Sequence, residues 1–181
     1  KDARSGGGPD ERQPDAACVR EIPADDAQHE GFTFAVSLER PDALDAALRA
    51  VREASAANTA GRDERFAIYL DSTGFPPSAW KDAVKQCRRA GASCLLKLPQ
   101  IFRQEARRYF ETHRSALFAA EFDGLVIGSM EEIQFLKDMG WEKPLVFDHN
   151  LYGFNHMAAE LYESLGAVRQ TIPSIRCMIC C

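Results

Sequence analysis

The segment Asp148–Asn155 holds the densest group of side chains that could do chemistry. It brings a carboxylate, an imidazole and amides together directly after an apolar run, Pro144–Phe147, that is typical of a strand. A carboxylate and an imidazole in such a place could transfer protons or bind a metal ion. We therefore predict Asp148, His149 and Asn150 as candidate catalytic residues.

A purely structural interpretation of the same segment stays open. Asp and Asn at a junction between a strand and a helix often do no more than satisfy backbone N–H groups, and Asn155 is typical of a helix N-cap. We keep Asn155 both as a cap and as a candidate substrate-binding residue.

Other polar side chains are expected where neighbouring strands end. Asp71 follows one apolar run, and Lys97 lies within another, where a lysine needs a partner. Arg103 lies near the start of a predicted helix that is rich in arginine. The charged face of this helix also carries glutamates, so we interpret it first as a solvent-exposed face and, as an alternative, as a surface that contacts nucleic acid. Lys97, Asp71 and Arg103 complete the candidate substrate-binding set.

The elements that must position these residues alternate along the chain. Short apolar runs, typical of buried parallel strands, are separated by segments in which apolar residues recur at helical spacing. The strands are expected at 32–36, 66–70, 94–98, 124–127, 144–147 and 168–172, and the helices at 41–51, 77–91, 101–118, 130–139 and 155–165.

This alternation predicts an α/β fold made of parallel βα repeats. No strand is followed by a G-x-G-x-x-G turn, which argues against a dinucleotide-binding sheet and favours a partial TIM-like (β/α) barrel. A complete barrel needs roughly 250 residues, and the sequence has 181. We therefore expect a piece of a longer protein.

Composition divides the sequence into three parts. Residues 1–29 are rich in Gly, Pro and charged residues and are predicted to be a disordered linker. Residues 30–173 form the partial barrel domain. Residues 174–181 form an aberrant Cys-rich tail, in which Cys177, Cys180 and Cys181 make too few ligands for a zinc or iron–sulfur site.

Charge and cysteine usage exclude several classes of protein. The net charge is −5, which does not fit a nucleic-acid surface built on bulk charge. No apolar run is long enough to cross a membrane, so no membrane partner is expected. The six cysteines are not spread as in a disulfide-bonded secreted domain, which favours a cytoplasmic location. No metal-binding or nucleophile motif appears, so no metal and no cofactor are predicted for this chain.

Four segments resemble, in order and spacing, the later part of the collagenase-like peptidases (peptidase family U thirty-two). These segments are Leu98–Arg103, Phe122–Val126, Glu131–Leu136 and Asp148–Asn155. The resemblance covers roughly residues 32–173, after which Ser174–Cys181 departs from the family pattern, as a frameshift or premature end would produce.

This resemblance implies a TIM-barrel-like hydrolase, a protease that acts on collagen-like, gelatin-like or other peptides, and an upstream barrel domain of the same polypeptide as partner. Other members of the family hydroxylate RNA with an iron–sulfur cluster held by four cysteines, which implies an RNA substrate and such a cluster in the full-length protein. We expect a fragment of a peptidase that is inactive alone. The alternatives are part of the RNA-hydroxylating enzyme and a non-catalytic, substrate-binding or scaffold region.

Overall fold

The structure is a computed structural model that describes residues 33–57, 65–148, 150–151, 156–165 and 167–170. The predicted linker (1–29) and tail (174–181) lie outside the described residues. The predicted barrel domain contains every residue that is described.

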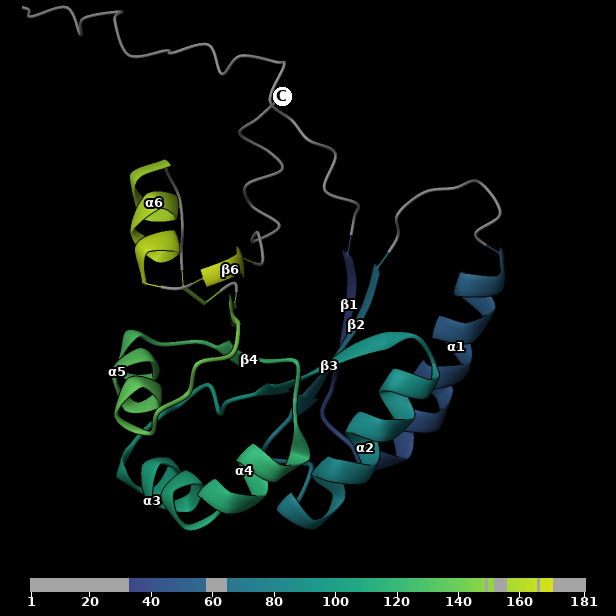
Figure 1. The fold of residues 1–181 in the computed structure, drawn as a ribbon, viewed down its shortest axis with the longest axis horizontal. Helices are drawn as coiled ribbons and strands as arrows, with labels where there is room; N and C mark the ends of the chain where they lie inside the picture. The colour runs from purple at the N-terminus through teal and green to yellow at the C-terminus, as the bar shows by residue number, and fades with distance from the viewer. Residues whose placement is uncertain (1–32, 58–64, 149, 152–155, 166, 171–181) are drawn as a thin grey trace, which may run out of the picture. The chain divides into compact units, whose positions relative to one another are not determined.

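The described strands form one six-stranded parallel sheet in the order β1-β2-β3-β4-β5-β6. Each strand is hydrogen-bonded to the strand that follows it in the sequence (Figure 1). The register is regular except at Leu145 and Val146, where the pairing with the last strand shifts. The strands are β1 (Thr33–Leu38), β2 (Arg65–Asp71), β3 (Ala92–Lys97), β4 (Gly124–Ile127), β5 (Leu145–Phe147) and β6 (Ala167–Gln170).

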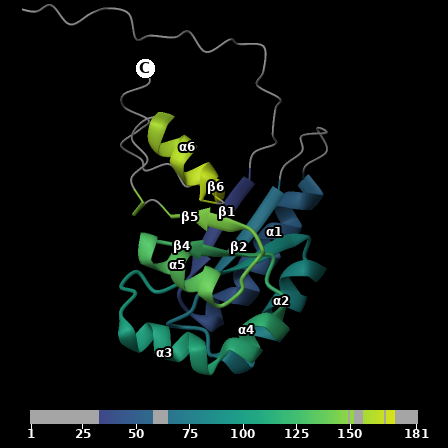
Figure 2. The ribbon, with the colours of Figure 1, turned by 60° about the vertical axis from the view of Figure 1, so that its left-hand side comes forward.

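Helices connect the strands, as parallel pairing requires. A short 3₁₀ turn, Pro41–Ala43, precedes the first helix, because Pro41 fixes the backbone at a position that needs no N–H donor. Figure 2 shows the helices of the first four connections gathered on one side of the strands. The α-helices are α1 (Leu44–Ala57), α2 (Pro77–Arg89), α3 (Gln104–Thr112), α4 (Arg114–Ala120), α5 (Met130–Asp138) and α6 (His156–Ser164).

Two features show that the fold is a partial (β/α) barrel, as predicted. The strand order never reverses, whereas a doubly wound sheet has a point at which it does. The two faces of the sheet also carry two separate clusters of buried residues. Alternate residues such as Ile68, Leu96 and Phe147 face the helices in the main core. The intervening residues form a small cluster on the opposite, inner face: Ala67, Tyr69, Leu95, Val126 and Val146.

The helix-side core is built around aromatic rings. Trp80 is fully buried, stacks on Phe110 and meets Phe122 edge-on, with ring centroids 6.4 and 5.9 Å away. Its indole N–H donates to the Phe75 carbonyl at 2.8 Å, so the buried polar atom of the ring is satisfied. The inner face of α2 consists of four buried residues, Trp80, Ala83, Val84 and Cys87.

The prediction of one long helix over 101–118 is wrong. The structure has two helices, α3 and α4, separated at His113, whose backbone (φ −98°, ψ 17°) leaves the helical region. The hydroxyl of Thr112 donates to the Arg108 carbonyl at 2.8 Å, and this kind of bond back to the preceding turn bends helices. Apolar periodicity continues across the break, because Phe110 and Leu117 both face the core.

Candidate functional site

Polar side chains of three strands share the inner face at the carboxyl ends of the sheet. Asp71 and Lys97 are register partners on β2 and β3. Lys97 is in register with Val126, which pairs with Val146, and Asp148 lies two residues beyond Val146. Because side chains alternate between the faces of a strand, Asp71, Lys97 and Asp148 point to the side of the sheet opposite the main core. The carboxyl ends of the strands are where barrel enzymes carry their sites.

An ion pair is the centre of this group. Lys97 Nζ lies 3.0 Å from Asp148 Oδ2, and their side chains are 21% and 8% exposed. Asn150 Nδ2 donates to the same carboxylate oxygen at 3.2 Å. The pair joins β3 to β5 across the end of β4, where Gly128 has no side chain. Apart from its chain neighbours, a Cβ at Gly128 would meet no heavy atom of the described residues within 4 Å. The position of the missing Gly128 side chain is therefore open.

Asp71 is held by its own turn rather than by Lys97. Its Oδ1 accepts hydrogen bonds from the backbone N–H of Thr73, at 2.8 Å, and from the Thr73 hydroxyl. The next residue, Ser72, donates its N–H to the Lys97 carbonyl at 3.0 Å. These bonds fix the β2 end beside the lysine and orient the Asp71 carboxylate.

Glu132 is close to this cluster but is not among the predicted site residues. This residue lies in the first turn of α5 and is fully buried. Its Oε2 accepts the N–H groups of Gly128, at 2.7 Å, and Ser129, at 3.4 Å, while Oε1 is buried and has no hydrogen-bond partner. The spacing Ser129-x-x-Glu132 is that of a capping box and could have identified it.

The environment of Glu132 changes its protonation. The pKa of Glu132 is raised to about 7, mainly because burial disfavours the charged form; the hydrogen bonds from Gly128 and Ser129 oppose this rise and the negative charge of Asp148 adds to it. Near neutral pH this carboxyl therefore exists in both protonation states, close to the Lys97–Asp148 pair.

The structure brings together some of the predicted site residues and not others. Asp148, Asn150 and Lys97 form one cluster, with Asp71 on the adjacent strand. Arg103 lies elsewhere, in a groove between α3 and α5. The predictions for His149 and Asn155 lie outside the described residues. Within the described ranges, no group of three or more His, Cys, Asp or Glu side chains could hold a metal ion.

No helix in the described part of the chain has the length and apolar character to cross a bilayer. Cys87 and Cys94 are buried free thiols in the core. The cytoplasmic location stays a prediction that rests on cysteine usage.

No family model matches the sequence, and no curated protein matches it. Among solved structures, the chain is similar to the thiamine phosphate pyrophosphorylase of Pyrococcus furiosus, with a TM-score of 0.47 and 14% identity over 79% of this chain. It is also similar to a protein from Coccidioides immitis assigned as a fructose-1,6-biphosphate aldolase, with a TM-score of 0.47 and 14% identity over 80% of this chain. The chain covers 60% of the first structure's length and 74% of the second's. Neither likeness bears on activity.

The predicted membership of the collagenase-like peptidases is wrong, and the hydrolase and RNA-modification assignments lose their support with it. No family model and no curated protein matches the chain, so nothing beyond the four short segments supports that family. The iron–sulfur cluster expected in a longer protein rested on the same resemblance. Of the segments that carried the resemblance, Leu98–Arg103 connects β3 to α3, Phe122–Val126 leads into β4, and Glu131–Leu136 lies within α5. Glu132 accepts backbone N–H groups at the start of its helix, which is a structural role.

Proposed function

We propose that the inner face at the carboxyl ends of β2, β3 and β5 binds a small carbonyl compound, which Lys97 attacks to form an imine. The observation that carries this proposal is the contact of 3.0 Å between Lys97 Nζ and Asp148 Oδ2. Primary amines are the side chains that react with carbonyl substrates in this way.

The chemistry needs a proton acceptor next to the lysine. An ammonium must lose a proton before its nitrogen can attack, and Asp148 is within direct reach. The new C–N bond then forms at the carbonyl carbon, the carbonyl oxygen takes one proton from that nitrogen and a second proton from Asp148, and the C–O bond breaks so that the oxygen leaves as water. Asp148 can return the proton that this departure needs. Asn150 holds the carboxylate in place, and the open space beside Gly128 gives room for the substrate.

Trapping tests the proposal without knowledge of the natural substrate. The chain is incubated separately with pyruvate and with glycolaldehyde, reduced with borohydride, digested and examined by mass spectrometry. Lys97 is expected to be modified at least tenfold more than Lys81 and Lys137, which are exposed. Asp148→Asn should lower modification at Lys97 and leave it unchanged at the two control lysines. Equal modification of all three lysines would overturn the proposal.

A second candidate is a non-catalytic scaffold region. It is favoured by the way the ion pair ties β3 to β5 across β4, since a bond of this kind can serve only to fix the strand ends. On this interpretation Lys97 is not trapped by either carbonyl, while its removal still destabilises the fold. An upstream barrel domain as partner stays a prediction.

A further inference from the structure

A groove of about 620 Å³ runs between α3 and α5 on the helix side of the sheet, away from the inner face that carries Lys97. Its volume is within the range of small-molecule sites. Side chains one turn apart on α3 line one wall, and the first turns of α5 line the other. The residues that matter for its chemistry are Phe102, Arg103, Arg107, Arg108, Glu131 and Gln134.

The central arginine is held in place. Arg107 Nε lies 3.3 Å from Glu111 Oε1, its Nη2 lies 3.5 Å from Asp138 Oδ2, and its guanidinium stacks over the Phe135 ring at 5.3 Å. Contacts on three sides restrict the rotamers of this side chain. A guanidinium positioned before binding loses little conformational entropy when it meets an anion.

The flanking arginines differ from Arg107. Neither Arg103 nor Arg108 has an ion pair or a side-chain hydrogen bond within the described part of the chain, and both are exposed. Glu111 and Asp138 both contact Arg107, so Arg103 and Arg108 face one further carboxylate of the groove, Glu131. Guanidinium groups that are not paired with a carboxylate are suited to bind an anionic ligand.

We propose that this groove binds a small organic phosphate, preferably one with two linked phosphate groups. A guanidinium fork matches two oxygens of a phosphate, so Arg103 and Arg108 could each hold one phosphate on either side of Arg107. Phe102, which lines the groove and is 8% exposed, offers an apolar surface for the organic part. Gln134 lines the opposite wall, and its Nε2, which donates one N–H to Asp138 Oδ1 at 2.8 Å, has a second N–H for a ligand.

The test uses inorganic pyrophosphate as the probe, titrated into the full chain by calorimetry at low ionic strength. The double variant Arg103→Ala/Arg108→Ala should weaken binding at least tenfold. Arg49→Ala/Arg52→Ala, which removes two exposed arginines of α1, is the matched control and should change the dissociation constant less than twofold.

Two further comparisons test whether the arginine geometry of the groove, and not its charge alone, determines the affinity for pyrophosphate. Arg103→Lys/Arg108→Lys keeps the charge but removes the paired N–H donors of the guanidinium groups, and this variant should bind pyrophosphate with intermediate affinity. Citrate, which carries a similar charge on carboxylates, should bind the unsubstituted chain more weakly than pyrophosphate does. Absence of pyrophosphate binding, an equal loss in both alanine double variants, or equal affinity for citrate would each overturn the proposal.

Discussion

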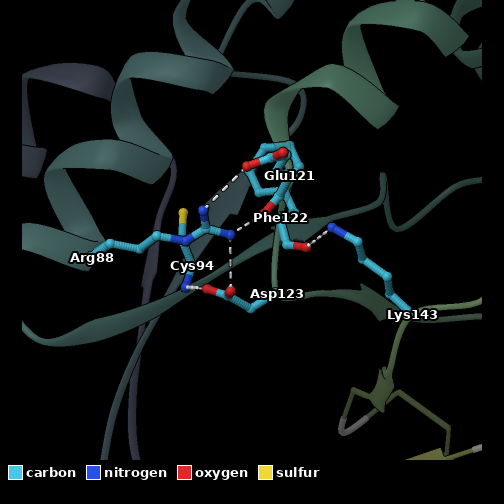
Figure 3. A network of polar contacts seen from close by, with 6 residues as sticks. All are labelled: Arg88, Cys94, Glu121, Phe122, Asp123 and Lys143. Carbon is cyan, nitrogen blue, oxygen red and sulfur yellow. Dashed lines mark hydrogen bonds and ion pairs between the residues drawn. The ribbon is translucent and has the colours of Figure 1, made fainter.

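Asp123 and Cys94 hold each other by two hydrogen bonds at the start of β3 and β4. The Asp123 carboxylate accepts the Cys94 N–H at 2.8 Å, and the Asp123 N–H donates to the Cys94 carbonyl at 2.9 Å. Figure 3 shows that Arg88 reaches the same carboxylate, at 3.2 Å, and also contacts Glu121. On the other side, Lys143 Nζ donates to the Phe122 carbonyl at 2.8 Å. These bonds lie at the amino ends of the strands, where side chains of a barrel serve stability.

Asp123→Ala is therefore expected to destabilise the fold by about 1–3 kcal/mol, because the Cys94 N–H would lose its acceptor within the sheet. Urea unfolding followed by circular dichroism measures this change. Asp82→Ala, at an exposed carboxylate 3.7 Å from Lys85, is the control and should change stability by less than about 0.5 kcal/mol. An equal loss in both variants would contradict the structural role of Asp123.

Removal of Lys97 is expected to destabilise the fold, because Asp148 keeps its charge and loses this ion pair. Lys97→Met removes the ammonium that lies 3.0 Å from Asp148, whose side chain is 8% exposed, and breaking a buried pair in this way costs about 3 kcal/mol. The double variant Lys97→Met/Asp148→Asn removes both charges and should recover most of that loss. The denaturant midpoints of the two variants, compared with that of the unsubstituted chain, measure the loss and the recovery of stability. A double variant no more stable than the single one would show that the pair's charges are not the cause.

Glu132 should make stability depend on pH. The pKa of Glu132 is about 7 in the folded chain, against an ordinary value of 4.5. Between these values the folded state binds more protons than the unfolded state, so the free energy of unfolding falls as pH rises from about 4.5 to about 7, by up to about 3 kcal/mol. Glu132→Gln should flatten this slope. Glu131→Gln, at the exposed neighbour, should keep it, and identical slopes for the two variants would contradict the assignment.

The thiols of Cys87 and Cys94 should resist alkylation until the chain unfolds. Both side chains are fully buried, and a hydrogen bond with Cys87 together with burial raises the pKa of the Cys94 thiol. Iodoacetamide followed by peptide mass spectrometry should modify both residues in urea and neither in buffer. Modification in buffer at the rate of a free thiol would show that this part of the core opens readily.

An exposed apolar patch on β1 should promote self-association. Phe34 and Val36 are 54% and 47% exposed, although their neighbours on β2 and β3 lie under helices. Phe34→Ser/Val36→Ser should shift sedimentation toward smaller species at the same protein concentration, because apolar surface drives association. Ala46→Ser/Ala50→Ser, at exposed positions of α1, is the control and should leave the distribution unchanged.

The fold was predictable because apolar residues recur at strand or helix spacing in most of the described elements. The runs before Asp71, Lys97 and Asp148 gave the strand ends and hence the inner-face cluster. The direction of the Lys97 side chain was not predictable, since it depends on which alternate residues of β3 meet the helices. The break between α3 and α4 at His113 was also not predictable, because Phe110 and Leu117 continue the apolar pattern across it. The raised pKa of Glu132 was not predictable either, because it results mainly from the burial of this carboxyl in the folded chain.

Each strand pairs with the next strand in the sequence, and this order affects how the chain can fold during its synthesis. Partners in the sheet are close in sequence, as Thr33 with Arg65 and Phe66 with Ala92 show. A nascent chain can therefore dock each new strand on the previous one as it leaves the ribosome, without waiting for distant residues. During synthesis only the most recent strand edge is unpaired on that side, so the interval in which two growing chains can join there is short.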